Sequence, residues 1–345
     1  MLPLLPALAL GLLIVPVTGG TSVGVVQASH GGRGAGPTAD APSPIVVRPN
    51  ELPRGPASTV RWLVDNVVHT GGGNTVTMPW TRLGARAHDL RLVGRTADGW
   101  LVKSFDGHTW TLWSIRGGKR HVVTSSSPTE GEVVSFQLSR NHQRFLVHLF
   151  DGDRTTSISV RDLHNAQVAA QDFAGVGNVL AFSGSTLIVN VTDTQRWDVD
   201  AQTVDALGVD AAGADIGHGL LFVTDPATGK SGPTSLESPG TPPSWRATMA
   251  QVEVSPGGGR VLSRNTLDGN RLTVYNRETG AVRASFSVRY LASEAPIWES
   301  NRSFVLIAAV NGLGDRETLV RCRINGSCQR ISAIRPRDTI SLPPL

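Results

Sequence analysis

Long stretches free of glycine and proline are scarce in this sequence. Glycine occurs 38 times and proline 21 times in 345 residues, and both are spread along the whole chain. Few windows are therefore long enough for a helix of several turns. Between these breakers the chain is rich in short runs of β-branched and apolar residues. The composition predicts an all-β protein.

Lysine is also rare and occurs only at positions 103, 119 and 230. The formal net charge of +4 therefore comes almost entirely from arginine. The arginines are dispersed and do not form the basic stripe that follows a phosphate backbone. No histidine stands near another histidine or a cysteine at the spacing of metal ligands. We expect no nucleic-acid partner, no cofactor and no metal site.

The only two cysteines, Cys322 and Cys328, lie close together in Thr318–Ser332, TLVRCRINGSCQRIS. If Ile324–Gly326 forms a three-residue hairpin loop with Gly326 in the left-handed region, the two cysteines face each other across two strands. This register predicts a disulfide, with two free thiols as the alternative. A single facing pair is typical of an exported protein in an oxidising compartment.

The first 27 residues carry no charged side chain, and Leu2–Val17 is rich in leucine. Small residues at Val26–Ala28 match a signal-peptidase site, so residues 1–28 are predicted to be a signal peptide. An uncleaved membrane anchor is the alternative. We expect a secreted or extracytoplasmic protein, or else a membrane-anchored one with its folded part outside. Residues 29–43, rich in glycine, proline and alanine, are expected to form a disordered linker.

The stretch Ala250–Val288 contains four strand-like runs separated by turn sequences, which predicts one four-stranded antiparallel unit. Its opening feature is a small polar residue or glycine, a short turn and an apolar strand. This marker recurs at Thr96–Trp100, Ser139–Phe145, Ser183–Leu187, Gly217–Leu220, Ser255–Val261 and Ser300–Phe304. The markers start 43, 44, 34, 38 and 45 residues apart. A period near 40 indicates propeller blades or a related array.

An irregular seventh unit is expected in Pro44–Ala87. The fold class predicted is all-β, a seven-bladed β-propeller of four-stranded antiparallel blades over residues 44–335, with six or eight blades as alternatives. Residues 336–345 are expected to form a C-terminal tail. Whether Pro44–Arg48 belongs to the first unit or closes the last one is left open. Asp153–Ala174 lacks glycine and proline and could form a helix, although Thr155–Val160 alternates like a strand.

The Val254–Gly258 turn with Arg260–Leu262, and the Val274–Gly280 closing strand and turn, resemble the repeats of TolB-like, YVTN-type and WD-repeat β-propellers. The resemblance covers most of Pro44–Ser332, but only one blade carries it well. It implies the fold and no activity, because such propellers serve many unrelated tasks.

Six aspartates follow the second strands of their units and should lie on one face of the ring: Asp106, Asp151, Asp153, Asp193, Asp225 and Asp268. Aspartate is common in such turns because its side chain bonds the local backbone, so we expect structural roles. A second group is expected to lie in a solvated loop: Asp198, Asp200, Asp205, Asp210 and Asp215.

These features predict an exported, monomeric, non-enzymatic binding or scaffolding module at or outside the cell envelope, with an unknown protein, peptide or glycan ligand. The alternative is a secreted hydrolase or lyase with its site at the mouth of the central channel. Its candidate residues lie in loops that enter the inner strands: His88, Glu130, Asp210 and Glu294. A purely structural envelope component is a third hypothesis.

Overall fold

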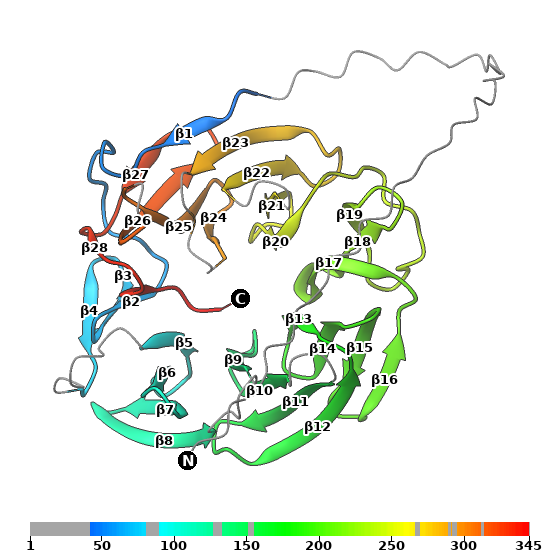
Figure 1. Cartoon of the computed structure of the whole chain (residues 1–345), viewed down its shortest axis with the longest axis horizontal. Helices are drawn as coiled ribbons and strands as arrows, with labels where there is room; N and C mark the ends of the chain where they lie inside the picture. Colours follow the sequence, from blue (N-terminus) through cyan, green and yellow to red (C-terminus); the bar gives the residue numbers. More distant parts are fainter. Residues whose placement is uncertain are drawn as a thin grey trace, which may run out of the picture. The chain divides into compact units, whose positions relative to one another are not determined.

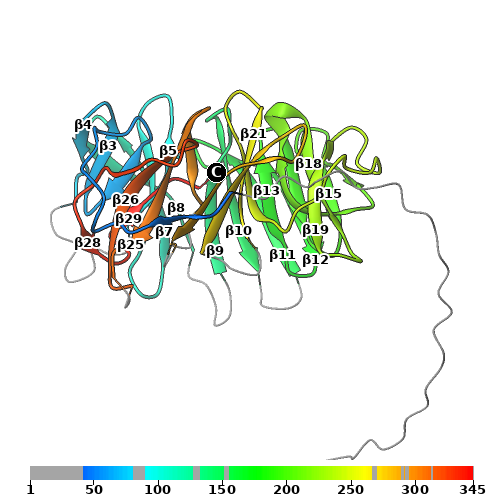
Figure 2. The same ribbon diagram turned by 90° about the horizontal axis from the view of Figure 1, so that it is seen from above.

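The computed structural model describes residues 42–80, 90–126, 133–150, 155–265, 270–288, 291, 295–311 and 314–344. Their strands form seven sheets arranged around a central axis (Figure 1). Seen edge-on, the sheets stand next to one another in a single layer (Figure 2). The described residues contain one short 3-10 helix, η2 (Ile216–His218). The predicted seven-bladed, all-β propeller is confirmed.

The first four blades are built from consecutive strands, apart from the inner strand of the first. Blade 1 contains β2 (Trp62–Val64), β3 (Val67–Gly71) and β4 (Asn74–Thr77). Blade 2 contains β5 (Arg91–Arg95), β6 (Trp100–Phe105), β7 (Trp110–Arg116) and β8 (Lys119–Ser126). Blade 3 contains β9 (Val133–Leu138), β10 (Arg144–Phe150), β11 (Thr155–Asp162) and β12 (Gln167–Ala174). Blade 4 contains β13 (Asn178–Phe182), β14 (Thr186–Asn190), β15 (Thr194–Asp198) and β16 (Thr203–Ala206).

The last three blades depart from four consecutive strands. Blade 5 has three, β17 (Asp210–Asp215), β18 (Leu220–Asp225) and β19 (Lys230–Ser235). Blade 6 contains β20 (Ala250–Val254), β21 (Arg260–Arg264), β22 (Arg271–Asn276), β23 (Val282–Val288) and β1 (Ile45–Val47). Blade 7 contains β24 (Ile297–Ser300), β25 (Ser303–Ala309), β26 (Arg316–Arg323), β27 (Cys328–Arg330) and β28 (Arg335–Pro336).

Both ends of the described chain join blades that are distant in sequence. Strand β1 pairs in parallel with β23 at the outer edge of blade 6, so the Pro44–Arg48 segment neither belongs to the first unit nor closes the last one. Strand β29 (Ile340–Ser341) pairs with β2 and supplies the inner strand of blade 1. The propeller therefore extends into the segment expected to be a tail, and the ring is closed within blade 1.

The repeated marker forms the turn between the first and second strands of a blade. In blade 6 the hydroxyl of Ser255 accepts a hydrogen bond from the backbone amide of Arg260 at 3.1 Å. Ser139 does the same for Arg144 in blade 3 at 3.0 Å. The strand that follows the turn is buried, as in β21, where Val261, Leu262 and Ser263 are all buried. In these two blades the marker thus combines a side chain that holds the turn with the apolar strand that fills the blade.

The described part of the Asp153–Ala174 stretch, Thr155–Ala174, forms a hairpin of β11 and β12, so the helical alternative is wrong there. Residues alternate in β11 between buried and half-buried, with Thr156, Ile158 and Val160 facing the core. In Val60–Thr70, which resembles one uninterrupted strand in sequence, the chain turns between β2 and β3. Asp65 has a φ of 54° at this turn.

Most of the core lies between neighbouring blades. One apolar cluster joins Leu146 and Val160 of blade 3 to Leu187 and Trp197 of blade 4, and Trp197 is 1% exposed. Aromatic and aliphatic side chains thus fill the wedges between twisted sheets, and their burial is the main source of stability. Trp197 thus packs between blades 3 and 4.

The predicted disulfide is present between Cys322 and Cys328, which face each other across β26 and β27. The amide of Arg323 donates to the carbonyl of Ser327 at 2.8 Å, and Gly326 has a φ of 94°. The loop is the three-residue turn that the sequence predicted. In the described part of the chain no helix has the length and apolar character of a membrane span.

Candidate functional site

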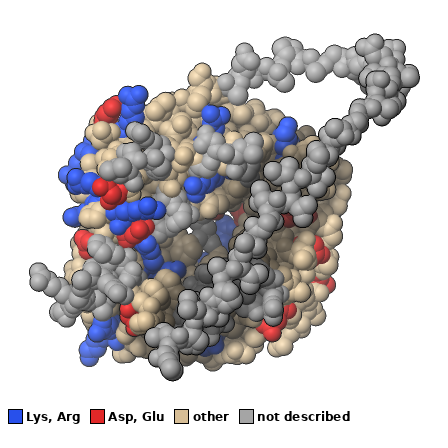
Figure 3. All heavy atoms as spheres, in the orientation of Figure 1, with Lys and Arg blue, Asp and Glu red and all other residues tan. Residues whose placement is uncertain are grey.

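A cavity of about 550 Å³ occupies one end of the central channel. Figure 3 shows the hollow at the centre of the ring. Its walls come from the carboxyl-terminal ends of the inner strands, from the residues before β2 and from the two prolines after β29. Much of the lining is apolar, including Leu92, Leu138, Phe182, Val252, Ile297 and Trp298. A concave apolar site with a few polar groups is the usual form of a ligand pocket.

The central polar pair of the cavity is Asp215 and His218. Asp215 ends β17 and caps η2, where its carboxylate accepts a hydrogen bond from the backbone amide of His218. The other carboxylate oxygen lies 2.7 Å from Nδ1 of the His218 ring. Because an ionised carboxylate can only accept, Nδ1 carries the proton of this hydrogen bond. A neutral His218 then has its lone pair on Nε2.

Arg140 reaches this pair from the turn after β9, two blades away. Its Nη1 atom donates to Oδ1 of Asp215 at 2.8 Å. The guanidinium lies so close to Gly217 that an added Cβ would come 1.8 Å from Nη1. Gly217 is therefore needed at this turn for Arg140 to reach the carboxylate. Asp215 is held from both sides, by a cation and by an imidazole.

Gly258 lies against the other edge of the His218 ring. A Cβ at this position would come 2.7 Å from Cδ2 and 3.1 Å from Nε2 of His218. Gly258 also has a φ of +71°, which glycine adopts without strain. The glycine-rich turn of blade 6 thus leaves room for the imidazole.

Glu253 on β20 completes the acidic side of the cavity. Burial raises the pKa of its carboxyl group well above the usual range, and the negative charge of Asp215 raises it further, while Arg140 opposes the shift. No hydrogen bond joins the Glu253 carboxyl to another residue of the described chain. Glu253 therefore holds a proton at pH values where an exposed glutamate is ionised.

Two cations line the cavity from blades 1 and 2. Arg61 precedes β2, and its Nε atom is buried with no hydrogen-bond partner among the described residues. Arg95 ends β5, with its guanidinium 5.6 Å from the centroid of the Trp100 ring. Glu299 also lines the cavity, but Arg321 pairs with it. Ionic groups of opposite sign thus reach the cavity from different blades.

Two groups of the cavity could take part in acid–base chemistry: the His218 imidazole, which Asp215 orients, and the protonated carboxyl group of Glu253. Asp215 fixes the tautomer and the orientation of His218, as carboxylates do in acid–base sites. Glu253 can donate a hydrogen bond or a proton. No set of three or more His, Cys, Asp or Glu side chains in the described residues is arranged to hold a metal ion.

Only one of the four channel-mouth candidates lies within the described residues. Asp210 begins β17, accepts a hydrogen bond from Nδ2 of Asn190 at 2.8 Å and is not among the residues that line the cavity. His88, Glu130 and Glu294 lie outside the described residues. The polar groups of the cavity lie at the opposite end of the inner strands from Asp210.

The sequence analysis missed Arg140, His218 and Glu253 and placed Asp215 in a solvated loop, which is wrong. The side chain of Asp215 is 14% exposed because Arg140 and His218 cover it. The available signal was the Asp-x-x-His spacing of Asp215 and His218, which is typical of a capped turn at a helix start.

Of the described turn aspartates, Asp106 and Asp225 bond the local backbone as expected. Asp106 accepts hydrogen bonds from the amides of His108 and Thr109, at 2.9 and 2.7 Å. Asp225 accepts one from the amide of Ala227 at 2.9 Å. Asp193 accepts one from the side chain of Gln195 at 3.1 Å. These turns join the second and third strands, at the end of the blades away from the cavity. Asp151, Asp153 and Asp268 lie outside the described residues.

No family model matches the chain, and no curated protein matches it. Among solved structures it is similar to a functionally unknown protein from Desulfotomaculum acetoxidans, at 11% identity and a TM-score of 0.52, covering 83% of this chain and 99% of the other. It is also similar to a chain of the mitotic checkpoint complex, at 12% identity and a TM-score of 0.51, covering 88% and 89%. An uncharacterized protein from Listeria monocytogenes aligns at 12% identity over 72% of this chain and 85% of its own, with a TM-score of 0.49. The first two likenesses agree with the β-propeller fold and carry no activity.

Proposed function

We propose that this protein is an exported binding propeller whose ligand enters the channel cavity beside Asp215 and His218. The observation that carries the proposal is the cavity of about 550 Å³, with an apolar wall and a small convergent set of polar groups. Such a volume suits a small molecule, or the end of a peptide or glycan. The protonated Glu253 would donate a hydrogen bond to an acceptor on the ligand.

Two features support export. The disulfide between Cys322 and Cys328 suits an oxidising compartment. The sequence also begins with an uncharged leucine-rich segment. Expression with the native leader, followed by sequencing of the mature amino terminus outside the cytoplasm, tests this part. We expect the mature chain to start at Ser29, and an intact leader on cytoplasmic protein would contradict export.

A hydrolase or lyase is the second candidate, and the Asp215–His218 hydrogen bond favours it. An imidazole held by a carboxylate can act as a general base, and the nearby Glu253 can act as the acid. A turnover assay separates the two hypotheses. An enzyme converts its ligand and loses turnover in the H218N and E253Q variants. A binding protein leaves the ligand chemically unchanged.

A thermal-shift screen of the purified protein tests the binding proposal. Glycans, peptides and envelope fragments are screened on the wild type and on the D215N variant, because a ligand that binds only the native state raises the melting temperature. We expect compounds that stabilise the wild type and have little effect on D215N. Compounds that stabilise both proteins equally would place the site elsewhere.

A further inference from the structure

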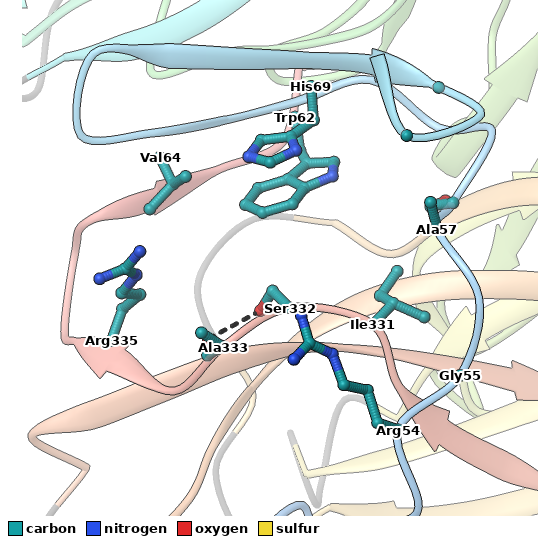
Figure 4. Close-up of a pocket in the computed structure, with 13 residues that line it drawn as sticks. Arg54, Gly55, Ala57, Trp62, Val64, His69, Ile331, Ser332, Ala333 and Arg335 are labelled. Atoms are coloured by element: carbon teal, nitrogen blue, oxygen red, sulfur yellow. Dashed lines mark hydrogen bonds between the residues drawn. The ribbon is translucent and has the colours of Figure 1, made fainter. Parts of the chain in front are cut away.

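A second cavity, of about 290 Å³, lies between blade 1 and blade 7 (Figure 4). Residues of β2 and β3 form one side, and the segment from Ile331 to Arg335 forms another. The chain between β1 and β2 completes it with Arg54, Gly55, Ala57 and Ser58. In Figure 4 the rings of Trp62 and His69 lie on one side of the cavity, with Ser332 and Ala333 on the other.

The walls of this cavity are held in place independently of any ligand. Glu299 and Arg321 form an ion pair whose two side chains are each 7% exposed. Arg321 donates to the carbonyl of Ala57 at 3.0 Å, and Glu299 accepts from the hydroxyl of Ser58 at 2.7 Å. The amide of Gly55 donates to the carbonyl of Arg330 at 2.9 Å. A rigid wall reduces the entropy that a ligand loses on binding.

The body of the cavity is apolar. Ala57, Trp62, Val64 and Ile331 line it. Trp62 stacks on His69 with ring centroids 3.7 Å apart and an interplanar angle of 4°. The hydroxyl of Ser332 is already engaged, because it accepts from the amide of Leu319 at 2.9 Å. These walls favour an apolar ligand body.

The charges that line the cavity are both positive. Arg54 and Arg335 are exposed, and neither forms an ion pair with a residue of the described chain. No acidic side chain is among the lining residues. Burial lowers the pKa of His69, and the positive charge of Arg335 lowers it further. Figure 3 shows Lys and Arg side chains, with some Asp and Glu among them, on the side of the ring that carries β28.

Hydrogen-bonding groups are also free in the aromatic pair. Neither the indole nitrogen of Trp62 nor the ring nitrogens of His69 are hydrogen-bonded to another described residue. A neutral imidazole offers one donor and one acceptor, and the indole offers one donor. The cavity therefore combines an apolar body, two guanidinium groups and unpaired ring nitrogens.

We propose that this cavity binds a small organic carboxylate, with its apolar body against Trp62 and Ile331 and its carboxylate held by Arg54 and Arg335. Guanidinium groups bind carboxylates through paired, charge-assisted hydrogen bonds. An organic carboxylate would cover the apolar wall of the cavity, whereas an inorganic anion would leave that wall exposed to water. The wall therefore favours the organic ligand. This site shares no lining residue with the channel cavity, although Ser58 of its wall donates a hydrogen bond to Glu299 of the channel wall.

The test is isothermal titration of the full chain with benzoate. Benzyl alcohol serves as the neutral analogue and inorganic phosphate as the anion without an apolar body. We expect benzoate to bind with the highest affinity of the three, and its Kd to rise about tenfold in each of R54Q and R335Q, the loss of one charge-assisted contact. R337Q is the matched control, since Arg337 is exposed nearby but does not line the cavity. Its Kd should equal that of the wild type.

A second readout reports on the cavity itself. The His69 ring resonance is titrated with pH in the absence and presence of saturating benzoate. A bound carboxylate near the ring should raise the pKa of His69, because an opposite charge favours the imidazolium. Three results would overturn the proposal: no benzoate binding, equal affinity for benzyl alcohol or phosphate, or R54Q and R335Q titrations that match R337Q. An unchanged His69 titration in the benzoate complex would also overturn it.

Discussion

Glu317 in β26 accepts a hydrogen bond from the backbone amide of Ile340 in β29, at 2.8 Å. This contact joins blade 7 to the inner strand of blade 1. Ile340 is 1% exposed and Leu342 is 2% exposed, so β29 and the residue after it pack into the protein core. The hydroxyl of Ser341 also accepts from the amide of Leu92 in blade 2 at 3.1 Å. A two-residue strand thus connects three blades.

Truncation after Asp338 should therefore destabilise the ring. Loss of the buried Ile340 and Leu342 side chains alone removes about 3–6 kcal/mol of stability. Urea denaturation followed by tryptophan fluorescence measures the change. Truncation after Leu342 is the matched control, because it keeps β29, and it should unfold close to the wild-type midpoint. Equal midpoints for both truncations would contradict closure by β29.

The buried pair of Glu299 and Arg321 should contribute more than an exposed ion pair. Arg321 also donates hydrogen bonds to the carbonyls of Pro56 and Ala57. R321A therefore leaves the Glu299 carboxylate buried without its partner and removes the hydrogen bonds to the segment before β2. We expect R321A to lose about 3–5 kcal/mol of unfolding free energy. R337A, at an exposed arginine, should lose less than about 0.5 kcal/mol. Similar losses in the two variants would show that the pair is not stabilising.

The same pair predicts an acid-sensitive part of the stability. The hydrogen bonds of Arg321, with those of Thr59 and Ser58, outweigh the effect of burial and lower the pKa of Glu299 from 4.5 to about 2. The stabilisation is therefore complete above pH 4.5 and is lost as the pH falls toward 2. By linkage it is worth about 3 kcal/mol. E299Q should lack this component and match the wild type at pH 2, and a parallel pH profile for the two proteins would refute the assignment.

Glu253 should have the opposite pH dependence. Because its pKa is raised in the folded state, the protonated form is favoured there, and ionisation costs stability as the pH rises through the folded value. E253Q should be more stable than the wild type on the alkaline side and equal to it below pH 4.5. Chemical denaturation across this range measures the difference. A difference in unfolding free energy between E253Q and the wild type that does not change with pH would contradict a protonated Glu253.

The disulfide should add only modest stability, because it closes a loop with a sequence separation of 6. The chain-entropy estimate for so short a loop is about 2 kcal/mol. The double variant C322S/C328S should fold and lose about this amount in denaturant. Native protein denatured without reductant should show no reactive thiol, and two reactive thiols would mean that the bridge is absent in solution.

The architecture could be predicted because its signals are local. The markers at Ser139, Ser183, Ser255 and Ser300 each place a hydroxyl that holds the turn before a buried strand, and the Cys322–Cys328 register follows from one hairpin loop. Strand β29 could not be recognised, because two strand residues followed by prolines resemble a tail, and the partner β2 lies at the other end of the chain. The pairing that buries Ile340 is a long-range property.

The channel site could not be predicted for a related reason. Arg140, Asp215 and Glu253 come from blades 3, 5 and 6, and no local motif links them. The repeat spacing located the ends of the inner strands but did not indicate which end is lined by polar groups. Asp210 and Asp215 lie at the two ends of β17, and only Asp215 lines the cavity.

The most direct test of the account is the affinity of a ligand found in the screen for the wild type, for D215N and for D106N. Asp106 holds a turn at the opposite end of the blades, so D106N is the matched control. We expect the Kd to rise at least about tenfold in D215N, which frees both Arg140 and His218, and to stay unchanged in D106N. Equal affinity of the wild type and D215N would contradict a ligand site in the channel cavity.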